Sequence, residues 1–261
     1  RNRLIAKTIR GFESHPLRSI FYPSMIKSIA MIALIWCGSL VSVYKGRDFI
    51  RQNIYLPIRS SIKYSNIIGP YKKTDCPENI ISIAIFGQSN SANFVSQKSD
   101  IAIPSNLYQY DWKSQKCYLY KEPLLGADGW EGNVITYTAI KMANNSNKPI
   151  VIIPFGIGGT SVLDWAYGDL SNQHQIVMTR VKESLMYPRI FLWHQGESDS
   201  NLPEDVYYNA LRKIVESTFK SFPQSSFGIA LASRCIHEPS NPVRSAQTRI
   251  SQDLPNSFIS A

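Results

Sequence analysis

Four short apolar runs, separated by amphipathic stretches, dominate the chain from residue 80 onward. The runs cover residues 80–86, 149–155, 189–193 and 227–232. Each is rich in Ile, Val, Leu or Phe and too short for an ordinary helix, which is typical of a buried strand. Apolar strands that alternate with helices predict a parallel sheet that is covered on both faces. We therefore expect a three-layer α/β/α fold with a central parallel sheet.

The stretches between these runs carry helix signals. Residues 134–144 and 175–186 are amphipathic, and 203–219 begins with Pro followed by two acidic residues, a recognisable helix start. Residues 88–132 are polar and aromatic, so we interpret them as an insertion that shapes a pocket or packs over the sheet edge. A last strand is expected at 257–261.

Positive charge is concentrated in the N-terminal part of the chain. The net charge is +9, but residues 1–73 hold 13 Lys or Arg and two acidic residues, whereas residues 74–261 hold 15 basic and 17 acidic ones. A nucleic-acid-binding domain would carry this charge on its folded surface, so we expect no nucleic-acid partner. A basic arm beside an apolar segment favours anionic lipid instead.

An uncharged segment at 28–44 lies within this basic part, between Lys27 and Lys45. Its 17 residues are at the short limit for crossing a hydrocarbon core of about 30 Å. We interpret it as a single transmembrane anchor, with a buried core helix and a cleaved signal peptide as the alternatives. Lys and Arg are almost equally frequent on its two sides, so charge does not fix the orientation.

Four segments follow from these patterns. They are a basic arm (1–27), the membrane anchor (28–44), a basic juxtamembrane connector (45–79) and a folded domain (80–261). The connector is interrupted by Pro and Gly, and a short helix is expected near 47–55.

Cysteine and histidine spacing predicts no metal centre. The four cysteines form no CxxC pair and no Cys/His cluster with zinc spacing. Cys76 and Cys117 could pair if the domain is exported, which the sequence leaves open. A glycine-rich turn at 156–161 matches half of a dinucleotide fingerprint, but Ser161 replaces the third glycine. We therefore expect no metal and no nucleotide cofactor.

Each apolar run ends in a turn that carries chemically useful groups. These turns cover residues 87–90, 156–161, 194–199 and 233–237. Because the carboxyl ends of parallel strands meet at one sheet edge, we expect the four turns to gather there. Together they hold a hydroxyl, glycine N–H groups, an amide and carboxylates. Acyl transfer needs such a set: a nucleophile, a base and donors for an oxyanion.

Three of these turns resemble motifs of the SGNH hydrolase superfamily, in its sialate O-acetylesterase and acetylxylan-esterase branch (carbohydrate esterase family 6-like). The motifs are GQSN at 87–90, GGT at 158–160 with Trp165 nearby, WHQGESD at 193–199, and an Arg-x-x-Gln stretch at 244–247. The resemblance covers about residues 80–261. It implies a flavodoxin-like α/β/α fold and a metal-independent serine esterase that acts on an acetylated carbohydrate.

The resemblance also implies roles for individual residues. Ser89 would be the nucleophile. The oxyanion hole would comprise the N–H of Ser89, an N–H of Gly158 or Gly159, and the side chain of Gln195. Glu197 would orient the catalytic histidine.

The catalytic histidine is the main departure from the family pattern. The family places it in an Asp-x-x-His block shortly after the last strand, where this sequence stops. We expect the base to lie beyond Ala261, so that the domain is C-terminally truncated and inactive or nearly so as given. His194 and His237 are the internal alternatives, whereas His174 is expected at the surface or at a helix cap.

The function implied is removal of O-acetyl groups from a carbohydrate through an acyl-serine intermediate. The alternatives are O-acetyl transfer onto a glycan with the same residues, and a non-catalytic glycan-binding protein of this fold. A glycan substrate suggests a membrane-anchored enzyme whose domain lies on the extracytoplasmic side.

Overall fold

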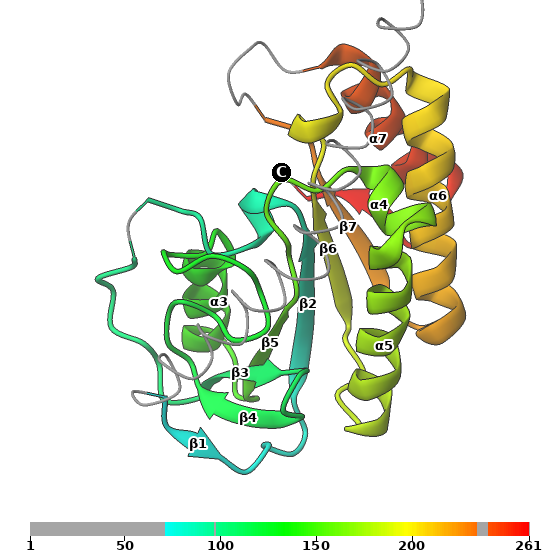
Figure 1. Ribbon diagram of the computed structural model, residues 1–261. Coiled ribbons are helices and arrows are strands. Elements are labelled where there is room, and N and C mark those ends of the chain that lie inside the picture. Colours follow the sequence, from blue (N-terminus) through cyan, green and yellow to red (C-terminus); the bar gives the residue numbers. More distant parts are fainter. Residues whose placement is uncertain (1–70, 97, 234–239, 261) are drawn as a thin grey trace, which may run out of the picture. The chain divides into compact units, whose positions relative to one another are not determined.

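An eight-stranded sheet organises the computed structural model, which describes residues 71–96, 98–233 and 240–260. The strand order is β1-β4-β3-β5-β2-β6-β7-β8, and the six strands from β3 to β8 in this order run parallel (Figure 1). The strands are β1 (Lys73–Thr74), β2 (Ile81–Gly87), β3 (Leu107–Asp111), β4 (Lys116–Leu119), β5 (Ile150–Pro154), β6 (Ile190–His194), β7 (Ser226–Ala230) and β8 (Ser257–Ile259). The predicted central parallel sheet is confirmed.

Helices cover both faces of this sheet. Figure 1 shows α3 on one face and α4, α5 and α6 on the other. Helix α7 packs against α6 and β8. The helices are α3 (Ile135–Asn144), α4 (Val162–Tyr167), α5 (Asp169–Glu183), α6 (Glu204–Ser221) and α7 (Asn241–Asp253), with short 3-10 turns η2 (Ser89–Ser91) and η3 (Glu197–Asp199). The three-layer arrangement is therefore as expected from the sequence.

Alternation along β2 explains why this strand is apolar throughout. Ile83 and Ile85 pack on the α3 side, whereas Ala84 and Phe86 pack in the larger core on the opposite face. Successive residues of a strand point to opposite faces, so a strand between two helical layers needs apolar residues at every position. Each large side chain buried in this way contributes about 1.5–3 kcal/mol.

The segment 88–132 differs from the insertion predicted for it. It contributes β3 and β4, which extend the sheet beyond β5. The sequence pattern does not predict these strands because the segment is polar. One of its polar residues, Gln109, lies fully buried in β3. The Gln109 amide nitrogen donates to the carbonyl oxygens of Leu119 (3.3 Å) and Lys121 (3.0 Å), which offsets the cost of burying it.

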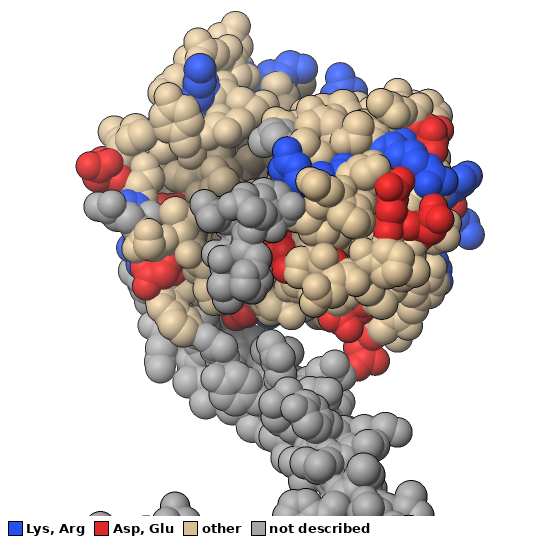
Figure 2. All heavy atoms as spheres, turned by 90° about the horizontal axis from the view of Figure 1, so that it is seen from above, with Lys and Arg blue, Asp and Glu red and all other residues tan. Residues whose placement is uncertain are grey.

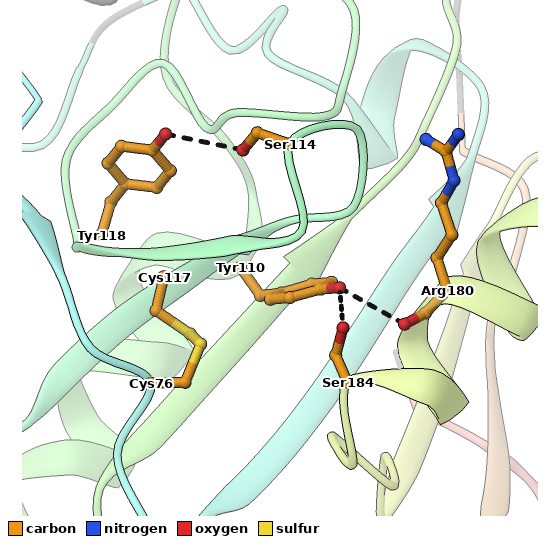
Figure 3. The surroundings of a disulfide bond; sticks show 7 residues. All are labelled: Cys76, Tyr110, Ser114, Cys117, Tyr118, Arg180 and Ser184. Atoms are coloured by element: carbon orange, nitrogen blue, oxygen red, sulfur yellow. Dashed lines mark hydrogen bonds between the residues drawn. A yellow bond between two sulfur atoms is a disulfide. The ribbon is translucent and has the colours of Figure 1, made fainter.

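The folded unit also includes residues that we assign from the sequence to the connector. Strand β1 pairs antiparallel with β4, and Cys76 forms a disulfide bond with Cys117 (Figure 3). The bond joins cysteines 41 residues apart, and a loop of this length predicts a stabilisation of about 4 kcal/mol through the unfolded state. The domain therefore begins before residue 80.

His174 is buried rather than at the surface. It lies on α5, which begins at Asp169, earlier than predicted. Its ring stacks on Phe86, with ring centroids 5.4 Å apart, and its Nε2 lies 3.2 Å from Thr218 Oγ1. Burial lowers the pKa of His174 to about 4, so the ring is a neutral member of the core at neutral pH.

Several predictions fall on residues outside the described ranges. They are the basic arm, the anchor at 28–44, the helix near 47–55 and His237. Within the described ranges, no helix combines the length and the hydrophobicity that a membrane crossing requires.

Candidate active site

The turn after β2 presents Ser89 at the carboxyl end of the strand. Gly87 has φ +128°, and a Cβ there would lie 2.3 Å from the carbonyl oxygen of His194, so only glycine fits. The N–H of Gln88 donates to the same His194 oxygen at 3.1 Å. Ser89 then begins η2 and is half-buried. Within the described part of the chain, neither its hydroxyl nor its N–H has a hydrogen-bond partner.

The turn after β5 packs against this nucleophile turn. The N–H of Ile157 donates to the carbonyl oxygen of Gly87 at 3.0 Å. Gly156 approaches Ser91 so closely that a Cβ there would lie 2.5 Å from Ser91 Oγ. Gly158 and Gly159 follow, and in the described ranges no protein acceptor occupies their N–H groups. The two turns thus offer backbone donors at one sheet edge, as an oxyanion hole requires.

Glu197 receives three hydrogen bonds on one carboxylate oxygen. Its Oε1 accepts from Asn90 Nδ2 (2.9 Å), from the Ser233 N–H (2.8 Å) and from Ser233 Oγ (2.8 Å). The other oxygen, Oε2, is buried and has no hydrogen-bond partner among the described residues. Turns after β2, β6 and β7 therefore fix this carboxylate with one acceptor left over. We name Asn90, Glu197 and Ser233 the Glu197 cluster.

His194 borders the Glu197 cluster. Its Nε2 lies 3.4 Å from Asn90 Nδ2. Burial lowers the pKa of His194, and the neighbouring Glu197 carboxylate opposes that shift.

Gln195 lies in a second, fully buried polar group. Its amide nitrogen donates to Thr160 O (3.0 Å), Gln88 Oε1 (3.2 Å) and Asp199 Oδ2 (2.5 Å), and its Oε1 accepts from the Tyr207 hydroxyl (2.9 Å). The amide is thus occupied by protein acceptors. Direct donation from Gln195 to an oxyanion stays a prediction, and these contacts favour a bracing role.

Asp199 connects this buried group to the start of α4. Its carboxylate accepts from Ser161 Oγ (2.6 Å) and from the Val162 N–H (2.7 Å). Burial raises the pKa of Asp199, and its hydrogen bonds act in the opposite direction. Asp199 therefore anchors the glycine turn to the turn after β6. We name Gln88, Gln195 and Asp199 the Gln195 brace.

Helix α7 adds further support through the Arg-x-x-Gln stretch. Gln247 Oε1 accepts from the Ala232 N–H (2.8 Å), and Gln247 Nε2 donates to Gln195 O (2.7 Å). Arg244 Nη1 donates to Ala232 O (2.8 Å). These bonds hold Ala232, which follows β7, beside Gln195. Ala232 directly precedes Ser233, which donates to Glu197.

Trp193 and Trp165 are buried and pack in the core. Their indole N–H groups donate to Tyr207 Oη (3.4 Å) and Thr160 Oγ1 (2.9 Å). Within the described ranges, no group of three His, Cys, Asp or Glu side chains is placed to hold a metal ion.

Figure 2 looks onto this edge of the domain. Most of the described surface in that view carries neither Lys or Arg nor Asp or Glu, and both signs are present among the charged side chains. In this view, the described part of the surface is therefore not dominated by positive charge.

Sequence comparison identifies the family. A family model described as "Carbohydrate esterase, sialic acid-specific acetylesterase" matches residues 83–260. The chain belongs to this family. The family and the fold agree with the SGNH-type resemblance found from the motifs, and membership supports ester hydrolase activity.

Comparison with a solved structure from Arabidopsis thaliana shows the same fold, and two further structures match less closely. A protein from Arabidopsis thaliana is similar with a TM-score of 0.57 and 21% identity, over 70% of this chain and 85% of that one. A carbohydrate acetylesterase from Xanthomonas citri matches with a TM-score of 0.49 and 16% identity, over 68% and 48%. The esterase EstA from a Pseudoalteromonas species matches with a TM-score of 0.40 and 18% identity, over 68% and 76%. A search of curated proteins gave no match.

The structure thus brings Ser89 and the Gly158–Gly159 turn to one sheet edge with Glu197. The sequence motifs assign no role to Ser233, although it follows a predicted strand at the same edge. Its position directly after an apolar run is the sequence feature from which a role at the site could have been inferred. Its contact with Glu197 depends on side-chain geometry between distant turns.

Proposed function

We propose that the protein is a serine esterase that removes O-acetyl groups from a carbohydrate through an acetyl-Ser89 intermediate. The observation that carries the proposal is the arrangement of Glu197. One carboxylate oxygen is held by Asn90 and Ser233, while the other is buried beside the Ser89 turn and has no hydrogen-bond partner in the described part of the chain. An unpaired buried acceptor costs free energy, so its retention favours a role in catalysis. Family membership supports the acetylated carbohydrate as substrate.

The first half-reaction forms the acyl-enzyme. Ser89 Oγ attacks the acetyl carbonyl carbon, its proton passes to a histidine base, and the carbonyl electron pair moves onto the oxygen. The N–H groups of Ser89 and of Gly158 or Gly159 stabilise this oxyanion. Collapse breaks the bond to the sugar oxygen, which takes the proton from the histidine.

The second half-reaction repeats these steps with water. The histidine removes a proton from the water molecule as its oxygen attacks the acetyl carbon. The bond to Ser89 Oγ then breaks, acetate leaves, and Ser89 regains its proton. No other co-reactant is needed.

Glu197 acts on the histidine rather than on the substrate. A carboxylate that accepts the second ring N–H of a catalytic histidine fixes its tautomer and stabilises its cationic form. Glu197 Oε2 is the acceptor we assign to this bond. We assign the base to a histidine, and among the described residues His194 is the candidate because it borders Glu197.

The Gln195 brace positions the turns that carry these groups. It joins the β2 turn, the glycine turn and the β6 turn through buried hydrogen bonds. We therefore assign Gln195 a positioning role and place the oxyanion donors on the backbone.

Acetate release by the full natural chain tests the proposal. Ser89→Ala is compared with Ser198→Ala, which changes an exposed serine on the same edge. The substrates are p-nitrophenyl acetate, acetylated xylooligosaccharides and 9-O-acetylated sialic acid. We expect hydrolysis to be lost only in Ser89→Ala. Undiminished hydrolysis by Ser89→Ala would contradict the proposal, and acetyl transfer to an added glycan would redirect it to a transferase.

We also propose that the domain is tethered by the segment 28–44 and lies on the extracytoplasmic side. The Cys76–Cys117 disulfide supports this because such bonds persist mainly in oxidising compartments. Protease digestion of intact cells checks it: digestion of the domain before lysis is expected, and complete protection would refute the location.

A further inference from the structure

Two exposed aromatic side chains lie together beside the nucleophile turn. Phe94 is 39% exposed and Trp130 is 48% exposed. Their ring centroids are 6.5 Å apart, and the ring planes are tilted by 51°. Exposed apolar side chains that lie together can form a binding surface.

The backbone under both rings is firmly held. The N–H of Val95 donates to Gly132 O (3.1 Å), and the N–H of Gly132 donates back to Val95 O (3.0 Å). The buried Asn93 side chain exchanges two hydrogen bonds, both 2.9 Å, with the backbone of Leu124. The two rings are therefore presented by a braced pair of segments rather than by a loose loop.

Phe94 reaches the glycine turn of the candidate oxyanion hole. A Cβ on Gly158 would lie 2.8 Å from the Phe94 ring, so ring and backbone are in direct contact. A substrate whose acetyl carbonyl lies between Ser89 and Gly158 would place the adjoining part of the molecule near Phe94.

We infer that Phe94 and Trp130 form a stacking platform for the pyranose ring that carries the acetyl ester. The inference rests on the proposed esterase function and specifies how that site holds its sugar. A pyranose ring has an apolar C–H face that packs on an aromatic ring. The two tilted rings offer such a face next to the nucleophile.

Kinetics of the full natural chain test the platform. The variants are Phe94→Ala, Trp130→Ala and the conservative Trp130→Phe. The control is Tyr187→Ala, which removes an aromatic side chain that is 53% exposed near the start of β6, at the opposite sheet edge. For acetylated xylooligosaccharides or 9-O-acetylated sialic acid, each alanine variant should raise KM about tenfold with kcat within twofold. Trp130→Phe should retain most of the affinity, and Tyr187→Ala should resemble the parent protein.

p-Nitrophenyl acetate separates the platform from a role at the acyl group. This substrate carries no sugar, so its kcat/KM should fall much less than that of the glycan substrates. An equal loss on both kinds of substrate would overturn the platform and place Phe94 against the acetyl group. Unchanged KM for both glycan substrates would overturn it as well.

A binding assay separates failure of the platform from failure of the proposed function. Calorimetry with Ser89→Ala protein and the deacetylated sugars, xylotriose and N-acetylneuraminic acid, requires no catalysis. If either sugar binds, and if adding Trp130→Ala weakens that binding about tenfold, the platform is supported. The sugar that binds then identifies the substrate type. Binding that is absent, or that is unaffected by Trp130→Ala in a variant with an unchanged melting temperature, overturns it.

Discussion

The Glu197 cluster and the Gln195 brace lie at the same sheet edge but differ in how fully their polar atoms are paired. In the Gln195 brace, Gln195 and Asp199 have partners at every side-chain oxygen and nitrogen. In the Glu197 cluster, one carboxylate oxygen has three donors and the other has none among the described residues. Full pairing is typical of a structural support, whereas an unpaired buried oxygen is typical of a group that acts on something else.

The difference also indicates how the two regions depend on each other. Leaving a buried acceptor unpaired costs about 1–3 kcal/mol. The Gln195 brace holds the three turns in place. The turns therefore do not rearrange to give Glu197 Oε2 a hydrogen-bond partner. Variants in the two regions should therefore separate activity from stability.

Glu197→Gln should have the largest effect. The amide keeps the shape of the side chain but removes the charge that supports a histidine cation, so kcat should fall about 10³-fold, equivalent to about 4 kcal/mol. Steady-state kinetics measure this, with the exposed Glu216→Gln as control. A melting temperature within about 2 °C of the parent is expected; a large drop in melting temperature with normal kcat would reverse the roles of the two regions.

Asp199→Ala should lose stability instead. It removes the buried acceptor for Ser161, Val162 and Gln195, so the free energy of unfolding should fall by about 3 kcal/mol. Chemical denaturation measures the change. Asp205→Ala is the matched control because its ion pair with Arg249 is at the surface and contributes little. Equal effects of the two substitutions would refute the bracing role.

Gln195→Ala decides between a positioning residue and an oxyanion donor. If Gln195 is a positioning residue, Gln195→Ala should lower the free energy of unfolding by about 2 kcal/mol and lower kcat by less than about tenfold. As a direct donor it would instead lower kcat about 10²–10³-fold. Denaturation and kinetics on the same preparation distinguish these outcomes, with the exposed Gln175→Ala as control.

Ser233→Ala should have the smallest effect. It removes one of the three donors to Glu197 Oε1 and leaves the backbone donor in place, so kcat should fall about tenfold, or about 1.4 kcal/mol. Kinetics relative to Ser198→Ala provide the measurement. The effect should disappear in a Glu197→Gln background; a persistent tenfold loss there would show that Ser233 does not act through Glu197.

Much of the fold follows from the sequence because apolar runs identify strands buried on both faces. Strands β2, β5, β6 and β7 were predicted within one or two residues, and their parallel arrangement places the motif turns at one edge. The sequence does not predict β3 and β4, because buried Gln109 and the aromatic residues around it do not form the continuous aliphatic run that is typical of a core strand. Helix α7 was missed because its apolar positions are few.

The candidate site is less predictable than the fold. The positions of Ser89 and Gly158 follow from strand ends, which depend only on local patterning. The inward orientation of Gln195 and the contact between Ser233 and Glu197 depend on pairing between side chains from different turns. No spacing rule in one sequence encodes such pairing.

The Cys76–Cys117 disulfide makes part of the chain a closed covalent ring. That ring contains β2, Ser89 and Phe94, so the nucleophile and one half of the aromatic pair are inside it. A single protease cut between the two cysteines would leave both fragments joined, and they would migrate as one molecule until a reductant opened the bond. The nucleophile turn of this domain is thus retained on the molecule even after its backbone has been nicked.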